Sequence, residues 1–322
     1  MAIKKYFEIE KNPRKGLLAF EWAMIIYLLF TLVMMMITYT KLQNPEAMLL
    51  ERGRYAIMTL ALWGVYRLLP CRVTLLFRVA LQLLYLSVWY PDTFELNRIF
   101  PNLDHVFAGY EQQLFGCQPA LLFSQKVSNP VFSEIMHLGY SSYFPLIALT
   151  TLFYYFYRFQ EFLRTEFVII GAFMIYYVIF VLLPVTGPQY YYLAAGIDQI
   201  AQGIFPNVGD YFSTHSEALA IPGWQDGFFY QCVASAHNAG ERPTAAFPSS
   251  HVGMTTILLL LACRTKNKKL ISTISFFYVL MCFATVYIQA HYAIDVIGGW
   301  ISAVVIYAFL QILGGKICPN KK

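Results

Sequence analysis

Long apolar runs separated by short polar segments make up most of the chain. A helix needs roughly 20 predominantly apolar residues to cross the hydrocarbon core of a bilayer. The pattern predicts eight membrane-spanning helices, at Leu17–Tyr39, Tyr55–Leu69, Val73–Tyr90, Ser133–Tyr157, Thr165–Pro184, Ser250–Cys263, Leu270–Gln289 and Ala293–Leu313. The second and sixth runs are short, so we expect their ends to be buried in protein rather than in lipid. The predicted fold is an all-α, polytopic membrane helix bundle.

The predicted bundle divides into two parts. Residues 1–72 hold a cytoplasmic N-terminal segment and two helices, and residues 73–322 hold a core of six helices. Two long connections, Pro91–Phe132 and Val185–Ser249, are rich in aromatic residues, Gly and Pro. Long connections of this kind usually carry function or small structures of their own. We expect both to fold as short helices over the outer membrane face.

Composition agrees with a membrane protein and excludes other classes. Hydrophobic residues make up 58% of the chain and charged residues 13%, whereas a soluble domain carries about 25% charged residues. So much apolar surface excludes a disordered chain. Six cysteines among 322 residues are too few for a secreted domain built on disulfides. The net charge of +5 indicates no nucleic-acid partner.

The distribution of basic residues predicts an orientation. If the N-terminus is cytoplasmic, most of the 23 Lys and Arg residues fall on the cytoplasmic side. This is the bias that sets membrane topology, and with an even number of spans it also places the C-terminus in the cytoplasm. The loop from Lys41 to Arg54 fits the rule least well, because it carries three of the remaining cations.

The cysteines leave one alternative open. Cys117 and Cys232 lie one in each long connection. On an oxidising side of the membrane they can form a disulfide, and two buried free thiols are an equal alternative. The cysteine spacing does not match metal-ligand spacing, so we predict no metal site.

Polar residues are costly inside a bilayer and often mark function. One cluster, Arg242-Pro243 followed by Phe247-Pro248-Ser249-Ser250-His251, opens the sixth span, and a second, His291-Tyr292 with Asp295, opens the eighth. The predicted topology places both at the outer face. His291 and Asp295 are four residues apart and share a helix face. The carboxylate can therefore hold one ring nitrogen and leave the other one basic.

The first cluster suits a phosphate group. Ser249 and Ser250 lie where a helix begins, and hydroxyls beside free backbone N–H groups form an anion site. Arg242 is the only Lys or Arg in the Val185–Ser249 connection. Taken singly, a histidine near an interface is more often structural, and a Pro-Ser-Ser run is most often a helix cap. Both clusters at one membrane face favour phosphate chemistry.

These motifs resemble a known family. Phe247-Pro248-Ser249-Ser250-His251 resembles the Pro-Ser-x-His signature of the phosphatidic acid phosphatase type 2 superfamily, and His291-x-x-x-Asp295 with Gly298-Gly299 resembles its other signature. The segment Tyr287–Gly299 is more closely similar to the inositol phosphorylceramide synthase branch, which carries Tyr-x-x-x-His-Tyr-x-x-Asp-x-Ile-Gly-Gly. The resemblance covers roughly residues 90–313.

Two cations of the superfamily's phosphatases are absent. Arg242-Pro243 matches the end of their Lys-x6-Arg-Pro element, but position 235 is Ser, and Ala284 and Thr285 stand where those enzymes carry Ser-Arg. A phosphate monoester carries nearly two negative charges and a diester carries one. Fewer cations therefore favour a phosphodiester substrate.

The resemblance implies a lipid phosphotransferase with phosphatidylinositol as donor and a ceramide-like lipid as acceptor, without metal or cofactor. It implies that His291 attacks phosphorus, Asp295 holds its tautomer and His251 is the general acid and base. Arg242, Ser249 and Ser250 would bind the phosphate. One alternative is a lipid or polyprenyl phosphate phosphatase with the same residues. Another is a non-enzymatic lipid-binding protein.

Three further residues are candidates for contact with substrate. Tyr190 follows a predicted span and can line a lipid entrance, although anchoring in the aromatic belt explains it equally well. His137 shares a helix face with Glu134 and Tyr140, and interfacial packing is its alternative role. Tyr287 opens the second resembling segment. The sequence does not indicate an oligomeric state.

Overall fold

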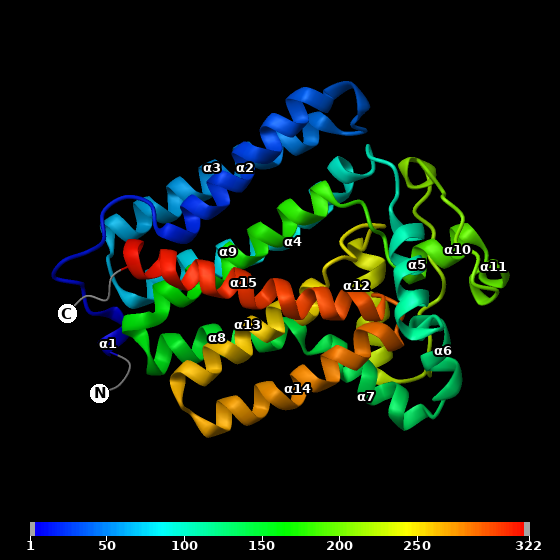
Figure 1. Cartoon of the computed structure of the whole chain (residues 1–322). Helices are drawn as coiled ribbons and strands as arrows, with labels where there is room; N and C mark the ends of the chain where they lie inside the picture. Colours follow the sequence, from blue (N-terminus) through cyan, green and yellow to red (C-terminus); the bar gives the residue numbers. More distant parts are fainter. Residues whose placement is uncertain (1–3, 319–322) are drawn as a thin grey trace.

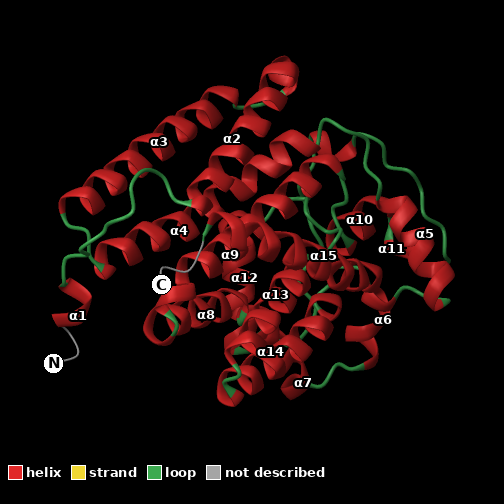
Figure 2. Ribbon diagram, turned by 60° about the vertical axis from the view of Figure 1, so that its left-hand side comes forward, coloured by secondary structure: helices red, strands yellow, loops and turns green. Residues whose placement is uncertain are grey.

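The protein is an all-helical bundle in this computed structural model, which describes residues 4–318 apart from the side chain of residue 239. No strand occurs among these residues, as the ribbon in Figure 2 shows. The helices are α1 (Lys4–Phe7), α2 (Ala19–Thr38), η1 (Tyr39–Lys41), α3 (Pro45–Leu68), α4 (Arg72–Asn97), α5 (Asp104–Phe115), α6 (Pro119–Lys126), α7 (Pro130–Ser141), α8 (Tyr143–Tyr157), α9 (Phe159–Leu182), α10 (Pro188–Ala195), α11 (Ile197–Ala201), η2 (Tyr211–Ser213), α12 (Phe228–Gly240), α13 (Ser250–Thr265), α14 (Lys268–Tyr287) and α15 (Ala293–Ile317).

Several helices identify an integral membrane protein. Five segments of the described chain are long and apolar enough to cross a bilayer: Ala19–Lys41, Arg72–Asn97, Phe159–Leu182, Lys268–Tyr287 and Ala293–Ile317. The other three predicted spans correspond to α3, which carries several charges, and to α8 and α13, which have 15 and 16 residues. Since both short helices fall below roughly 20 residues, the predicted number of eight spans is not confirmed.

One predicted span, Ser133–Tyr157, is interrupted in the structure. It forms two helices, because α7 ends at Ser141 and α8 begins at Tyr143. Pro145 has no N–H with which to continue the helical hydrogen bonds. The hydroxyl of Ser142 instead donates to the carbonyl of Gly139 at 2.6 Å. The sequence pattern did not reveal this break, because both sides of it are apolar.

Two other predicted boundaries are also corrected. Helix α4 continues beyond Tyr90, through Pro91, to Asn97. Helix α3 begins ten residues before the predicted Tyr55, at Pro45, and its first half is rich in charge. One of those charges, Arg52, forms an ion pair with Asp92 at 3.0 Å. The ion pair between α3 and α4 therefore accommodates Arg52, one of the charged residues that had indicated a loop.

The long helix α9 lies at the centre of the bundle. It packs against α2, α4, α8 and α15, and 78% of its most apolar stretch is buried inside the protein. Beside it, the guanidinium of Arg78 on α4 forms a fully buried ion pair with Glu21 on α2. The N-terminal helices thus share a core with the rest of the chain, and the division at residue 72 stays a prediction.

The two ends of the bundle differ. Figure 1 shows α1 and the C-terminal end of α15 at one end, and α5, α10, α11 and α12 gathered at the other. The second end is built from the two long connections, which contain the short helices α5, α6 and α10 to α12. All six cysteines are free, so Cys117 and Cys232 are not bonded, and Cys232 is exposed rather than buried.

Candidate active site

Two histidines from separate helices meet at the end of the bundle that carries the short helices. His251 lies in the first turn of α13, and His291 lies in the turn between α14 and α15. The Nδ1 atom of His251 is 3.3 Å from the Nε2 atom of His291. The backbone N–H of His291 donates to the carbonyl of Thr285 at 3.1 Å, which fixes the turn. The structure therefore brings the two predicted histidines together.

A backbone carbonyl orients His291. Its Nδ1 atom lies 2.8 Å from the carbonyl oxygen of Ala246. A carbonyl can only accept a hydrogen bond, so Nδ1 carries the proton and Nε2 presents a lone pair towards His251. Burial lowers the pKa of His291 from 6.5 to about 4, and the ring is neutral at pH 7.

The expected hydrogen bond from His291 to Asp295 is corrected by this geometry. The Oδ2 atom of Asp295 is 3.6 Å from Nδ1 of His291, which is longer than a hydrogen bond. That oxygen accepts instead from the backbone N–H of Tyr292 at 2.8 Å and caps the start of α15. Asp295 is fully buried, and the Ala246 carbonyl rather than Asp295 fixes the tautomer of His291.

Two tyrosines hold the ring of His251. Tyr140 at the end of α7 stacks on it with ring centroids 4.5 Å apart, and Tyr143 at the start of α8 packs at 4.4 Å. The interruption between α7 and α8 thus lies beside His251. Aromatic contacts on this ring restrict its rotation, which keeps Nδ1 directed at His291.

Asp104, at the start of α5, joins the segments around His291. Its carboxylate accepts hydrogen bonds from the backbone N–H groups of Thr186 and Gly187 at 2.7 and 2.8 Å, and from the hydroxyl of Tyr292 at 3.0 Å. Thr186 and Gly187 follow α9, and Tyr292 precedes α15. About two turns further along α5, Glu111 accepts from the backbone N–H of Ile294 at 3.0 Å. Helix α5 therefore fixes the turn that carries His291.

The Gly298-Gly299 pair allows α15 to approach α13. A Cβ atom at Gly299 would lie 2.8 Å from the carbonyl oxygen of Ser249, and one at Gly298 would lie 2.6 Å from the ring of Phe247. Both distances are shorter than side chains tolerate. The backbone N–H of Ser249 in turn donates to the carbonyl of Asp295 at 3.0 Å. The glycines therefore permit the close approach of the two histidine-bearing segments.

A small pocket of about 30 Å³ lies in front of the histidine pair. Among the described residues, its lining includes Arg242, Ser250 and Tyr190, each a predicted site residue. It also includes Glu241, whose carboxyl pKa is raised by burial. The pocket combines two imidazoles, one exposed guanidinium and a hydroxyl, a set that can bind and transfer a phosphate group.

Besides Asp295, three predicted site residues lie outside the pocket lining. The hydroxyl of Ser249 caps α13 by accepting from the N–H of Val252, and Ser249 is fully buried. The ring of His137 packs on Tyr230, and the hydroxyl of Tyr287 donates to the carbonyl of Val127 at 3.0 Å. The structure thus gives Ser249 a capping role and places His137 and Tyr287 in neighbouring packing clusters.

Several contributors were missed by the sequence analysis. The Ala246 carbonyl carries no side-chain signal, and only its position just before the Phe-Pro-Ser segment could have suggested it. Glu241 directly precedes Arg242, yet its carboxylate was not considered. Tyr143 lies three residues after Tyr140 and shares its helical spacing, which was the available signal.

Comparison with known proteins identifies the superfamily. A family model described as the PAP2 superfamily matches residues 105–309, a segment that contains both histidines and Asp295. No curated protein and no solved structure matches the chain. The matched segment covers more than half of the sequence and runs from α5 to α15. The chain therefore belongs to the PAP2 superfamily, whose members are generally phosphatases or phosphotransferases.

Proposed function

We propose that the protein is a membrane phosphotransferase that moves a phospho-head group, inositol phosphate from phosphatidylinositol, to a ceramide-like lipid. The observation that carries this proposal is the geometry of the histidine pair. With Nδ1 of His291 bound to the Ala246 carbonyl, Nε2 is the free nucleophilic atom. His251 lies 3.3 Å away, at the distance of a proton-transfer partner.

In the first step, Nε2 of His291 attacks the phosphorus of the donor. The N–P bond forms while the bond from phosphorus to the diacylglycerol oxygen breaks. His251 enters this step as the imidazolium and gives one ring proton to that oxygen, so diacylglycerol leaves neutral and the His251 ring becomes neutral. Arg242 and Ser250 stabilise the charge on the non-bridging oxygens, and the buried carboxylate of Asp295 favours the positive charge that develops on the His291 ring.

In the second step, the acceptor lipid takes the phospho-head group. His251 removes the proton from the acceptor hydroxyl, and the oxygen attacks the phosphohistidine. The N–P bond breaks and His291 returns to its neutral form. The two-step reaction needs no oxidant, reductant or added proton. His251 regains from the acceptor hydroxyl the proton that it gave to diacylglycerol.

The charge of the pocket supports a phosphodiester over a phosphate monoester. Arg242 is the only Lys or Arg among the described residues that line it. Glu241 beside it adds no positive charge, whether its carboxyl group is ionised or protonated. A single cation suits the one negative charge of a diester better than the nearly two charges of a monoester.

A phosphatase is the second candidate, and the volume of the pocket favours it. About 30 Å³ in front of the histidines accommodates a water molecule, whereas a lipid acceptor requires the lining side chains to move. In this alternative, water attacks the phosphohistidine and inorganic phosphate is released. The same residues act in both reactions.

Purified protein in proteoliposomes distinguishes these candidates. One reaction contains phosphatidylinositol and ceramide, another contains phosphatidic acid, and the lipids are analysed by mass spectrometry. Formation of an inositol-phosphate-bearing ceramide supports the transferase, and phosphate release from phosphatidic acid alone supports the phosphatase. A His291→Ala variant that retains either activity contradicts both proposals and supports a non-enzymatic role.

We further propose that both termini are cytoplasmic and that the histidine pair faces the extracytoplasmic side. The distribution of basic residues supports this orientation. Single-cysteine variants provide the test, one retaining Cys232, which is exposed, and one carrying only Lys269→Cys. A membrane-impermeant maleimide should label Cys232 in intact spheroplasts and the other cysteine only after permeabilisation. The opposite pattern would reverse the orientation.

A further inference from the structure

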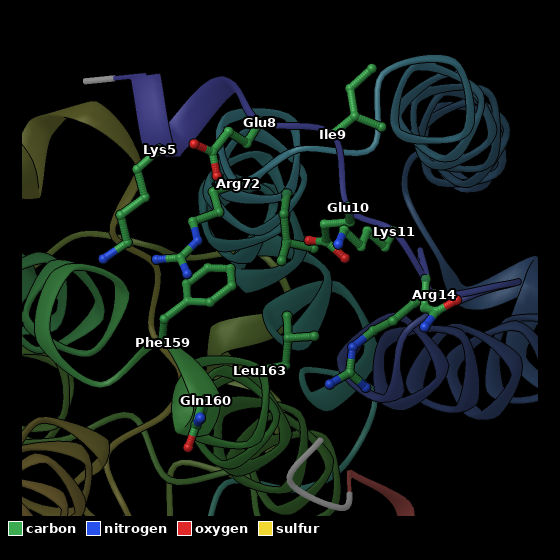
Figure 3. A pocket seen from close by; sticks show the side chains of 12 residues that line it. Lys5, Glu8, Ile9, Glu10, Lys11, Arg14, Arg72, Phe159, Gln160 and Leu163 are labelled. Atoms are coloured by element: carbon green, nitrogen blue, oxygen red, sulfur yellow. The ribbon is translucent and has the colours of Figure 1, made fainter. Parts of the chain in front are cut away.

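A second pocket lies at the opposite end of the bundle from the histidines. It has a volume of about 370 Å³ and is lined by α1, the segment that follows it and the first turns of α4 and α9. Figure 3 shows Lys5, Lys11, Arg14 and Arg72 among its side chains. None of these residues has a role in the proposed phosphotransfer, so this pocket needs a separate explanation.

The pocket lies at the depth of lipid head groups. Two of the five membrane-length helices begin at it, α4 at Arg72 and α9 at Phe159. Apolar residues form its inner part, namely Leu75 and Leu163, one turn into α4 and α9 respectively. Polar and charged groups surround its opening. This order, charge outside and apolar side chains inside, matches the boundary between phosphates and acyl chains.

Arg72 is the best-placed cation in this pocket. Its guanidinium carbon lies 3.9 Å from the centre of the Phe159 ring, and Figure 3 shows the two side chains stacked at the opening. This contact holds the guanidinium against the face of the ring. No carboxylate of the described residues forms an ion pair with it. Arg78, six residues later, is in contrast fully paired with Glu21.

The surrounding charges favour an anion. Four basic residues line the pocket against two acidic ones, Glu8 and Glu10. One of the two acids is already engaged, because Glu10 accepts a hydrogen bond from the hydroxyl of Tyr66 at 3.1 Å. The N-terminus of the 26-residue helix α4 adds a partial positive charge. With four basic and two acidic side chains in its lining, the pocket therefore keeps a net positive charge.

We propose that this pocket binds the phosphate of an anionic phospholipid head group, in the leaflet where α4 and α9 begin. Arg72 binds the phosphate oxygens, Lys5 and Lys11 contribute attraction at the opening, and the apolar residues contact the glycerol and the first acyl carbons. By the proposed orientation, this is the cytoplasmic leaflet. The proposal does not rest on the proposed phosphotransfer, since it concerns the other end of the molecule.

Binding of short-chain lipids to the purified full-length protein tests the proposal. Native mass spectrometry compares dioctanoyl phosphatidylglycerol, dioctanoyl phosphatidylcholine and inorganic phosphate at equal concentrations. All samples carry His291→Ala, so that turnover and failure of the proposed function do not influence the result. We expect phosphatidylglycerol to bind more tightly than phosphatidylcholine, and inorganic phosphate to bind weakly because it lacks the apolar part.

Substitutions locate the binding. Arg72→Gln should weaken phosphatidylglycerol binding at least about fivefold, the contribution of roughly one basic residue at an anionic lipid surface. Arg72→Lys should retain most of the binding. Lys269→Gln removes an exposed cation at the start of α14 that does not line the pocket, and it should have no effect. A double variant, Lys5→Gln with Lys11→Gln, replaces two exposed lysines of the pocket. It provides the second test in case Arg72→Gln does not fold.

Three results would overturn the proposal. Equal binding of phosphatidylglycerol and phosphatidylcholine would remove the requirement for an anionic head group. Unchanged binding in both the Arg72→Gln variant and the double lysine variant would place the lipid elsewhere. Binding of inorganic phosphate as tight as that of phosphatidylglycerol would make the ligand a soluble phosphate rather than a lipid.

Discussion

The two pockets of this molecule differ in volume and in the number of cations that line them. The pocket at the histidine pair measures about 30 Å³ and is lined by one cation among the described residues, whereas the pocket at the other end measures about 370 Å³ and is lined by four. In the first, backbone carbonyls and tyrosine rings fix both imidazoles. In the second, Arg72 rests on one aromatic ring and has no carboxylate partner.

The difference is what we expect between the proposed reaction site and the proposed binding site. Phosphoryl transfer requires a nucleophile held in one tautomer and one direction, which explains the closely packed surroundings of His291. Retaining a lipid requires net charge and room, but little directional control. Positive charge alone would thus indicate the wrong end of this protein as the reactive one.

The largest effect is expected from the nucleophile. His291→Ala should lower kcat by at least about 10⁴-fold, because the covalent route is lost. Intact-protein mass spectrometry after rapid mixing with donor lipid should show a phospho-head-group adduct on the wild type and none on the variant. The same variant should bind phosphatidylglycerol at the other pocket like the wild type. An adduct that persists in the variant would place the nucleophile elsewhere.

A smaller effect is expected at Asp295. If Asp295 fixed the tautomer of His291, Asp295→Asn would lower kcat by about 10⁴-fold, as loss of an orienting carboxylate does in a hydrolytic triad. Because the Ala246 carbonyl fixes the tautomer here, we expect a loss of only about 10- to 100-fold. Steady-state kinetics measures the difference. A loss of kcat as large as that caused by His291→Ala would mean that Asp295, and not the Ala246 carbonyl, fixes the tautomer of His291.

The one cation in the lining of the histidine pocket among the described residues provides a third test. Arg242→Gln should lower kcat/KM by about 10-fold, the cost of roughly one charge-assisted hydrogen bond. Lys126→Gln, which removes an exposed cation at the end of α6, is the matched control and should leave kcat/KM unchanged. Equal losses in both variants would mean that long-range attraction, rather than contact in the pocket, explains the role of Arg242.

The smallest effect is expected from pH. The pKa of His291 is lowered to about 4, so the neutral nucleophile persists as pH falls from 7 to 5.5. In a Glu241→Gln background, which removes the neighbouring carboxyl group, kcat/KM should then show no loss over this range, because the nucleophile stays neutral and the acid His251 gains protons as pH falls. A histidine titrating at 6.5 would give a loss of about eightfold. Such a loss would show that the histidine pair is hydrated rather than buried.

Much of the site was predictable because its side chains carry the chemistry. His251 and His291 belong to polar segments at the starts of apolar runs, so the predicted topology brought them to one face. Gly298 and Gly299 fit the same reasoning, because they permit the approach of α15 to α13. The superfamily was likewise predictable from these two motifs, and the comparison confirmed it.

The remaining features depend on pairings that no local pattern reveals. The first half of α3 appeared too charged for a helix in the bundle, but Asp92 neutralises Arg52 from another helix. The break between α7 and α8 is hidden within a continuous apolar run. The orienting acceptor for His291 is a backbone carbonyl at Ala246, and hydrophobicity says nothing about the direction of a carbonyl.

The carboxylate of Asp104 has a consequence for biosynthesis. It accepts a hydrogen bond from the hydroxyl of Tyr292, which lies 188 residues later in the chain. At the usual rate of translation the ribosome needs roughly 10 to 40 seconds to make that interval. During this time Asp104 lacks one of its hydrogen-bond donors, and the turn that carries His291 does not yet exist. The candidate site is therefore complete only after the turn between α14 and α15 has been made.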